Sequence, residues 1–112
     1  MKMIRALIKP FKLGDVRAAL LEAGVQGMTV LETMEFGRHK SENDADKGGE
    51  REVDLASAYQ VEVVVSAASV DTVVRAISGA GITGMNGDGK IFVSSIDQAL
   101  RIRTGETGFD AL

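Results

Sequence analysis

Apolar residues recur with helical spacing in two stretches of the chain. Each set follows the i, i+3, i+4, i+7 pattern that gives a helix one apolar stripe: Val16, Ala19, Leu20 and Ala23, then Val70, Val73, Val74 and Ile77. We expect Ser69 to cap the start of the second helix. Gly24 and Gly81 are expected to end the two helices.

Four further segments have the length and composition of strands: residues 2–9, 29–36, 59–65 and 91–95. In the third of them, Val61, Val63 and Val65 alternate with Glu62 and Val64. This alternation predicts one apolar face and one mixed face. A short helix is expected over residues 96–100.

The chain also repeats itself once. A shift of 57 positions places the Ala-Gly-x-x-Gly-Met string of residues 23–28 on the same string at 80–85, and residues 4–8 on 61–65. Each copy is a strand, a helix and a second strand. Two such units predict an α+β, ferredoxin-like double βαβ fold, with a four-stranded antiparallel sheet and both helices on one face.

The two helices leave the other face of that sheet uncovered. Leu7, Val64 and neighbouring apolar residues are expected on this open face. Because a monomer would expose them to water, the pattern favours an oligomer that buries this face.

Composition narrows the class of protein. The chain has 112 residues, 45% of them hydrophobic and 26% charged, which fits one soluble globular domain over residues 1–112. The absence of cysteine rules out disulfides and thiolate chemistry, and a net charge of −3 argues against a nucleic-acid surface. With no apolar run of membrane length and no signal-peptide core, we expect a cytoplasmic protein without direct membrane insertion.

Residues 37–58 have no counterpart in the other half of the repeat. Nearly half of them are Arg, Lys, Asp or Glu, and their apolar residues show no period. The simplest interpretation is a solvated hairpin extension. Long loops in small folds more often bind something, so we favour a functional loop.

A second insertion, Gly87-Asp88-Gly89-Lys90, directly precedes the last strand. Its glycines would let backbone amides approach an anion, and its lysine adds charge, although a plain β-turn would have the same sequence. In an extended chain Arg101 and Arg103 would point the same way. Together with Arg38 these cations could offset a nucleotide polyphosphate.

At this point the sequence resembles the PII signal-transduction family, over its whole length. The motifs that carry the resemblance are Ile-Lys-Pro-Phe-Lys-Leu at 8–13, Gly-Met-Thr-Val at 27–30, Phe-Gly-Arg at 36–38, Thr-Gly at 83–84, Gly-Asp-Gly-Lys-Ile-Phe-Val at 87–93 and Arg-Ile-Arg-Thr-Gly-Glu at 101–106. The resemblance implies a ferredoxin-like homotrimer that binds ATP or ADP in clefts between subunits. It also implies a T-loop at residues 37–58 that docks on a target protein, a B-loop at 83–90 and a C-loop at 101–108.

Carried over by position, the resemblance assigns a nucleotide site to ten residues. Thr29 and Val64 would lie near the adenine. The ribose and phosphates would be lined by Gly37, Arg38, Gly87, Asp88, Gly89 and Lys90. Arg101 and Arg103 would reach the phosphates from the neighbouring subunit.

The departures from the family pattern concern its effector. Members that sense 2-oxoglutarate carry, at the position of His39, a glutamine whose oxygen binds the Mg²⁺ that bridges ATP and the oxo-acid. An imidazole suits softer ions, which argues against Mg²⁺ here. Where the family has the lysine that pairs with the oxo-acid, this chain has Ala58. Where the family has a small residue in the loop, this chain has Glu35. We therefore expect weak or absent 2-oxoglutarate binding; His39 is a candidate metal or effector ligand, although a lone exposed histidine is the simpler interpretation.

The long loop lacks the family's usual modification sites. The uridylylated tyrosine is replaced by Arg51, and a serine modified in some lineages by Gly49. Because Gly37 and Arg38 belong to both the nucleotide site and the loop, we expect the nucleotide to set the loop's conformation, with the γ-phosphate as discriminator. The target would be a transporter or a metabolic enzyme.

Other classes remain open from the sequence. An enzyme that hydrolyses nucleotides would need a general base, and only His39 and Asp88 lie near the cations. An RNA-recognition domain would need paired aromatic residues on its strands, which are missing. A sensor of another small anion or of a metal ion, or a purely structural trimer, would share the same assembly. We favour a non-enzymatic sensor of ATP and ADP.

Overall fold

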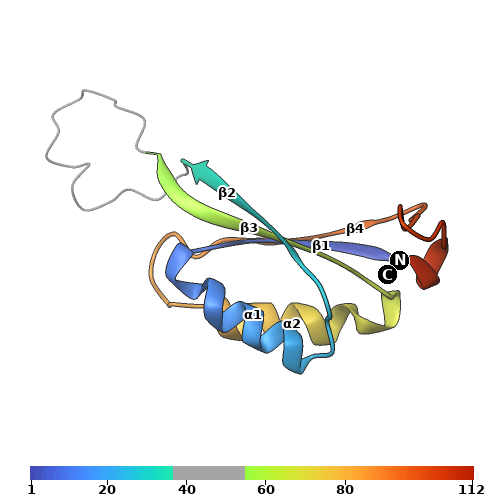
Figure 1. The fold of residues 1–112 in the computed structure, drawn as a ribbon. Helices are drawn as coiled ribbons and strands as arrows, with labels where there is room; N and C mark the ends of the chain where they lie inside the picture. The colour runs from blue at the N-terminus through green and yellow to red at the C-terminus, as the bar shows by residue number, and fades with distance from the viewer. Residues whose placement is uncertain (37–54) are drawn as a thin grey trace, which may run out of the picture.

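The computed structural model describes residues 1–36 and 55–112. Within them lie four strands, β1 (Lys2–Ile8), β2 (Thr29–Glu35), β3 (Ala56–Val65) and β4 (Ile91–Ser95), and two α-helices, α1 (Leu13–Glu22) and α2 (Val70–Gly81). The sheet has the order β2-β3-β1-β4, and every neighbouring pair is antiparallel. Both helices lie on one face of it (Figure 1). The predicted ferredoxin-like α+β fold is confirmed.

Three 3-10 turns complete the described elements. They are η1 (Pro10–Lys12) before α1, η3 (Ala67–Ser69) before α2, and η4 (Gly108–Ala111) near the end of the chain. No helix among the described residues is long and apolar enough to cross a membrane.

The core forms between the helices and alternate residues of the two central strands. Ile4 pairs with Val63 and Ala6 with Val61, and all four side chains are buried. From the helices, the predicted stripes contribute buried members to the same core: Val16 and Leu20 from α1, and Val73 and Ile77 from α2. The repeated strand–helix pattern therefore builds one shared core.

The open face carries the opposite residues of the same strands. Arg5 pairs with Glu62 on one side and with Phe92 on the other, and Leu7 pairs with Gln60. Leu7 and Val64 alternate with the core residues of their strands and therefore belong to this face, as predicted. Phe92, on the edge strand β4, is half-exposed.

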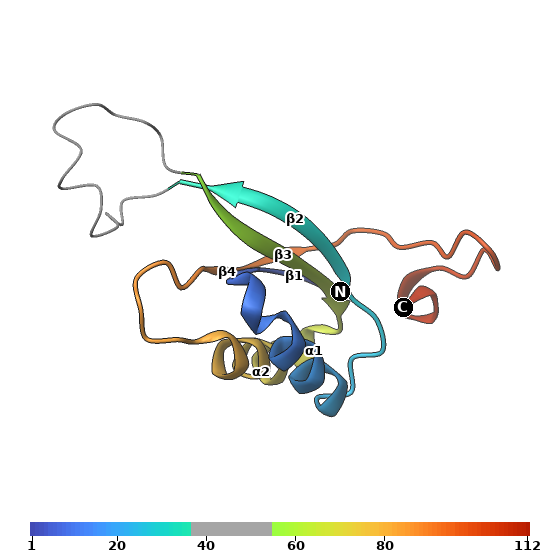
Figure 2. The same cartoon turned by 60° about the vertical axis from the view of Figure 1, so that its left-hand side comes forward.

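Strand β3 begins earlier than the sequence suggests. Residues 56–58 were expected in the long loop, but they pair with β2: Glu35 opposite Ala56, and Thr33 opposite Ala58. Ladder pairing overrides the low strand propensity of an Ala-Ser-Ala segment. As a result the β2–β3 hairpin extends well beyond the helices (Figure 2).

The helix ends follow two different rules. Gly24, with φ of 88°, ends α1 as predicted: its N–H donates to the Leu21 carbonyl, and the next N–H, of Val25, to Leu20. Gly81 is instead the last residue of α2, which ends where Ile82 becomes extended. Ser69 makes no side-chain cap; its hydroxyl pairs with that of Ser66, because η3 already extends the helix start.

The predicted short helix over residues 96–100 is wrong. The Ile96 N–H donates to the Met1 carbonyl at 3.1 Å, which continues the β1–β4 ladder. Leu100 then forms a bridge with Thr107. These pairings keep the backbone out of a helical conformation and send the C-terminal segment (residues 96–112) beyond the Met1 end of the sheet (Figures 1 and 2).

Candidate functional site

The glycine loop (residues 82–90) joins α2 to β4 and is organised around one carboxylate. Asp88 Oδ2 accepts hydrogen bonds from the backbone N–H groups of Thr83 and Gly84, both at 2.9 Å. Its Oδ1 accepts the Thr83 hydroxyl at 2.5 Å and lies 3.6 Å from Lys9 Nζ. The Asp88 carboxylate therefore holds the loop together from the inside.

These contacts favour the ionised form of Asp88. The hydrogen bond from the Thr83 hydroxyl, that from its backbone N–H, the Gly84 N–H and the Lys9 charge together lower the pKa of Asp88 to about 2, against a smaller opposing effect of burial. At neutral pH the carboxylate is fully ionised. So low a pKa makes this carboxylate a weak general base.

Gly89 fits where no other residue would. A Cβ built on it would stand 1.7 Å from the Leu7 carbonyl oxygen. On the same side, the Leu7 N–H donates to the Lys90 carbonyl at 2.9 Å. Gly84 and Gly87 have φ of 77° and 90°. The sequence Gly87–Lys90 is thus a tightly fitted loop against β1, beyond what a plain surface turn requires.

Lys90 is the outward-facing cation of this loop. Its side chain is exposed, and it forms no salt bridge with another described residue. Of the predicted loop residues, Asp88 faces inward, Gly87 and Gly89 shape the backbone, and Lys90 is available to an anion.

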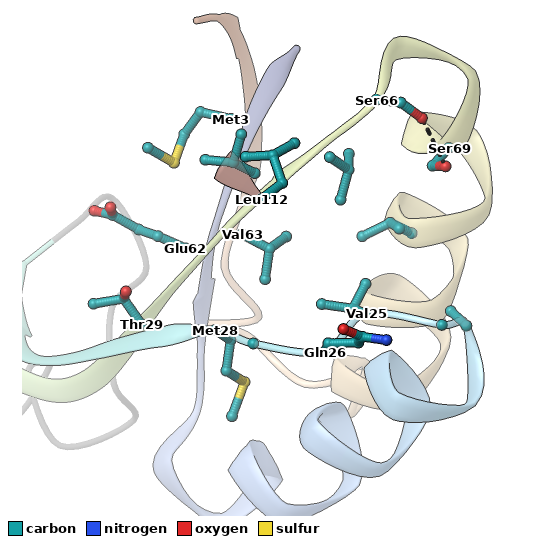
Figure 3. Close-up of a pocket in the computed structure, with 16 residues that line it drawn as sticks. Met3, Val25, Gln26, Met28, Thr29, Glu62, Val63, Ser66, Ser69 and Leu112 are labelled. Carbon is teal, nitrogen blue, oxygen red and sulfur yellow. Dashed lines mark hydrogen bonds between the residues drawn. The ribbon is translucent and has the colours of Figure 1, made fainter. Parts of the chain in front are cut away.

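Thr29 and Val64 line a cavity of about 640 Å³ elsewhere in the molecule. It lies where β3 has no strand beside it, because β2 begins only at Thr29, opposite Glu62. The turn that follows α1 closes one side, and Leu112 reaches in from the C-terminal segment (Figure 3). The structure thus brings these two predicted residues together.

Glu62 also lines this cavity, and the only sequence feature that marks it is a charge within a largely apolar strand. Its Oε1 accepts Gln60 Nε2 at 2.7 Å and Arg5 Nε at 3.3 Å. The second carboxylate oxygen makes no hydrogen bond with another described residue. Thr29 and Glu62 extend to the same side of β3 in Figure 3. The cavity therefore offers a fixed acceptor next to a hydroxyl.

The predicted geometry of Arg101 and Arg103 is wrong in one respect. The chain is not extended here: residues 102–104 form a turn, in which the Gly105 N–H donates to the Arg101 carbonyl at 2.8 Å. The two side chains therefore do not share one face of a strand. Arg101 donates to the Leu112 carbonyl at 3.0 Å, beside the cavity, whereas Arg103 is exposed.

The predicted site residues thus form two groups at opposite edges of the sheet. The glycine loop lies at the β4 edge, next to Leu7, and the cavity lies at the outer edge of β3, near Met3. Three strand spacings, about 14 Å, separate β4 from β2. Within one chain, the two groups do not share a cavity.

The remaining predicted residues, Gly37, Arg38 and His39, lie outside the described residues. Just before them, one carboxylate oxygen of Glu35 is shielded from solvent and has no hydrogen-bond partner in residues 1–36 and 55–112. In the same ranges, no group of three or more His, Asp and Glu side chains could hold a metal ion.

Comparison with known proteins agrees with the fold. The chain matches the family model described as nitrogen regulatory protein P-II over residues 1–106. It is 52% identical to the nitrogen regulatory protein P-II of Rhodobacter capsulatus, 50% to that of Rhizobium meliloti and 44% to that of Pyropia yezoensis, in each case over 100% of both chains. These relatives carry the name of a regulatory protein. The chain belongs to the nitrogen regulatory protein P-II family.

Proposed function

We propose that this protein senses adenine nucleotides, binding ATP or ADP between the subunits of a homotrimer and controlling a target transporter or enzyme through its long loop. The observation that carries the proposal is the division of the site. One corner of the sheet offers a phosphate-binding loop, another offers a nucleoside-sized cavity, and the two do not meet within one chain. Neighbouring copies would complete each other's sites.

The glycine loop suits the phosphate chain of the nucleotide. Lys90 supplies an exposed cation, and the loop backbone is already held in place by Asp88 and Gly89. An anion bound here would meet a positioned loop and would lose little affinity to ordering it. Arg38, one residue past Gly37, would add a guanidinium.

The cavity suits the adenosine half. Its walls are mostly apolar, with Val63, Val64 and Met28 among them, and its polar groups include Thr29 and Glu62. A flat purine gains from such walls, and a fixed carboxylate accepts hydrogen bonds from hydroxyl or amino groups. Arg101, which contacts Leu112 beside the cavity, and the exposed Arg103 would reach the phosphates.

Assembly follows from the open face. Leu31, Phe92 and other apolar side chains remain accessible there, and Ile102 of the C-terminal segment is 95% exposed in the single chain. A second copy would bury them, which supports the trimer that family membership implies.

We further propose that 2-oxoglutarate binds weakly or not at all. Ala58 is 7% exposed and sits opposite Thr33 on the open face, so it offers no positive charge to an oxo-acid carboxylate. The shielded carboxylate of Glu35 lies two residues along the same face of β2 and would oppose a second anion. These residues do not fit the Mg²⁺-bridged oxo-acid, whereas the glycine loop and the cavity do fit the nucleotide.

Catalysis is not part of the proposal. Asp88 is held ionised by its contacts inside the glycine loop, and Lys90 forms no salt bridge with a described carboxylate. The protein would act in the cytoplasm, where ATP and ADP are available, and it would bind neither nucleic acid nor the membrane directly.

The proposal is tested by titrating the purified protein with ATP and with ADP in a calorimeter, after solution scattering has established its assembly. A trimer that binds both nucleotides is expected. A monomer, or a trimer that ignores both at millimolar concentrations, would overturn the proposal; binding of another anion or a metal ion alone would replace it with a different sensor.

A further inference from the structure

Lys9 lies at the end of β1, next to the glycine loop, and carries no role in the site described above. Its side chain is 19% exposed, and its ammonium group lies near three oxygen atoms: the Thr83 hydroxyl at 3.1 Å, the Asn86 carbonyl at 3.1 Å and Asp88 Oδ1 at 3.6 Å. The first two contacts are hydrogen bonds, and the third is an ion pair at a longer distance. Lys9 is therefore turned toward the loop and away from any ligand.

The Thr83 hydroxyl is a second group that forms several hydrogen bonds in this loop. Its hydroxyl donates to Asp88 Oδ1 and accepts hydrogen bonds from Lys9 Nζ and from the Met85 N–H, the latter also at 3.1 Å. A hydroxyl has one proton and two acceptor positions, and all three are occupied. Thr83 thus connects the lysine of β1, the carboxylate of the loop and the loop backbone.

We propose that Lys9 and Thr83 are positioning residues, which hold the glycine loop in its binding conformation before a nucleotide arrives. This inference rests on the proposed function, since it assigns the loop to the phosphate chain. It separates two lysines at one end of the sheet: Lys90 contacts the phosphates, and Lys9 acts only through the loop.

Charge gives Lys9 a second effect. The Asp88 carboxylate lies in the loop that would bind a polyphosphate, and an unpaired negative charge there would repel the ligand. Lys9 lies 3.6 Å from that carboxylate and compensates it. Removing the ammonium both loosens the loop and leaves a negative charge inside it without its counter-charge.

Thr83 offers the cleaner substitution. Thr83→Val keeps the shape of the side chain but removes the hydroxyl, so Asp88 and Lys9 each lose a partner. Thr83→Ser keeps the hydroxyl and loses only a methyl group. A hydrogen bond to a charged group contributes on the order of tenfold to an equilibrium constant, so we expect ATP affinity to fall about tenfold in the valine variant and to stay within about threefold in the serine variant.

The experiment measures ATP affinity by calorimetry for the wild-type trimer and for Thr83→Val, Thr83→Ser and Lys9→Met. Lys12→Met is the matched control, because Lys12 forms an ion pair with the exposed Asp15 and does not contact the loop. Thermal unfolding of each variant shows whether the fold is retained. Lys9→Met should lose at least as much affinity as Thr83→Val, and Lys12→Met should bind like wild type.

Three results would contradict the positioning role. Valine and serine variants that lose affinity equally would make the methyl group, not the hydroxyl, the important feature. If the valine variant binds ATP as tightly as wild type, Thr83 does not position the glycine loop. If Lys12→Met binds ATP as weakly as Lys9→Met, the loss of affinity comes from the lower positive charge of the protein and not from the loop. A wild-type trimer that does not bind ATP would instead overturn the proposed function itself, so the two failures are distinguishable.

Discussion

The backbone of Gly89 packs directly against the carbonyl oxygen of Leu7, with no room for a side chain: a Cβ there would stand 1.7 Å from that oxygen. The Leu7 oxygen belongs to the backbone, so it cannot rotate away from a new Cβ as the end of a flexible side chain could. We predict that Gly89→Ala forces the glycine loop off β1 and costs about 1–3 kcal/mol of unfolding free energy. Denaturant unfolding measures this cost, and ATP affinity should fall with it.

Gly79→Ala is the control for that substitution. Gly79 lies in α2, where a Cβ would meet nothing within 4 Å. Alanine is the better helix former, so this variant should be as stable as wild type or slightly more stable. A Gly89→Ala protein with wild-type stability would mean that the loop does not pack on β1 as described.

A second prediction concerns the pH dependence of Asp88. Its folded-state pKa, about 2, lies below its ordinary value of 3.8. The stability that the carboxylate contributes is therefore fully present above pH 3.8 and is lost as the pH falls toward 2. The difference in unfolding free energy between wild type and Asp88→Asn should be constant from pH 7 to about pH 5 and should shrink between about pH 4 and pH 2.

Unfolding curves collected over that pH range check this expectation. A difference that stays constant between pH 4 and pH 2 would show that Asp88 titrates near its ordinary pKa in the folded protein, and that the contacts of Thr83 with its carboxylate are not formed in solution.

Much of the fold could be predicted from the sequence, because its cause is local. Helical spacing selected Val16, Leu20, Val73 and Ile77, and all of them are buried. The repeat fixed the order of strands and helices. Where expectations were wrong, a distant partner decided the outcome: the Ile96 N–H pairs with Met1, and residues 56–58 pair with β2.

The candidate site was less predictable for the same reason. Lys9 is separated from Asn86 by 77 residues along the chain, and neither segment has a sequence pattern that predicts their contact. The family resemblance placed Asp88 against the ribose and phosphates, whereas its partners turn it inward. Arg101 and Arg103 have strand-like spacing, but the backbone forms a hydrogen-bonded turn over residues 102–104 instead of a strand. Residue type indicated the chemistry of the site, and only the tertiary contacts assign the roles.

The third prediction concerns assembly through the open face. Phe92→Ser should break the proposed trimer into smaller species, because Phe92 is 51% exposed on the uncovered side of the sheet. The fold of each chain should survive, since Phe92 does not belong to the core. Sedimentation and far-ultraviolet circular dichroism measure the two properties separately.

Phe11→Ser is the control here, as Phe11 is 67% exposed but lies in η1, beside the start of α1. It should remain a trimer. An intact Phe92→Ser trimer would mean that subunits associate through a surface other than the open face.

The fourth prediction concerns the effector. In the presence of MgATP, the wild-type protein should show no micromolar binding of 2-oxoglutarate, because Ala58 offers no charge to its carboxylate. The double variant His39→Gln, Ala58→Lys should gain measurable affinity, since it restores an oxygen ligand and a cation. Calorimetry decides; micromolar binding by the wild type would contradict this reading of Ala58.

The central claim, that one site is built by two chains, is tested most directly by mixing two defective proteins. Lys90→Met damages the glycine loop, and a second variant with Arg101→Met and Arg103→Met damages the rim of the cavity. Each homotrimer alone should bind ATP poorly. Trimers refolded from a mixture should regain tight binding in a fraction of their clefts, where an intact loop of one chain meets an intact rim of the next. A mixture that binds no better than its components would show that the two halves do not meet between subunits.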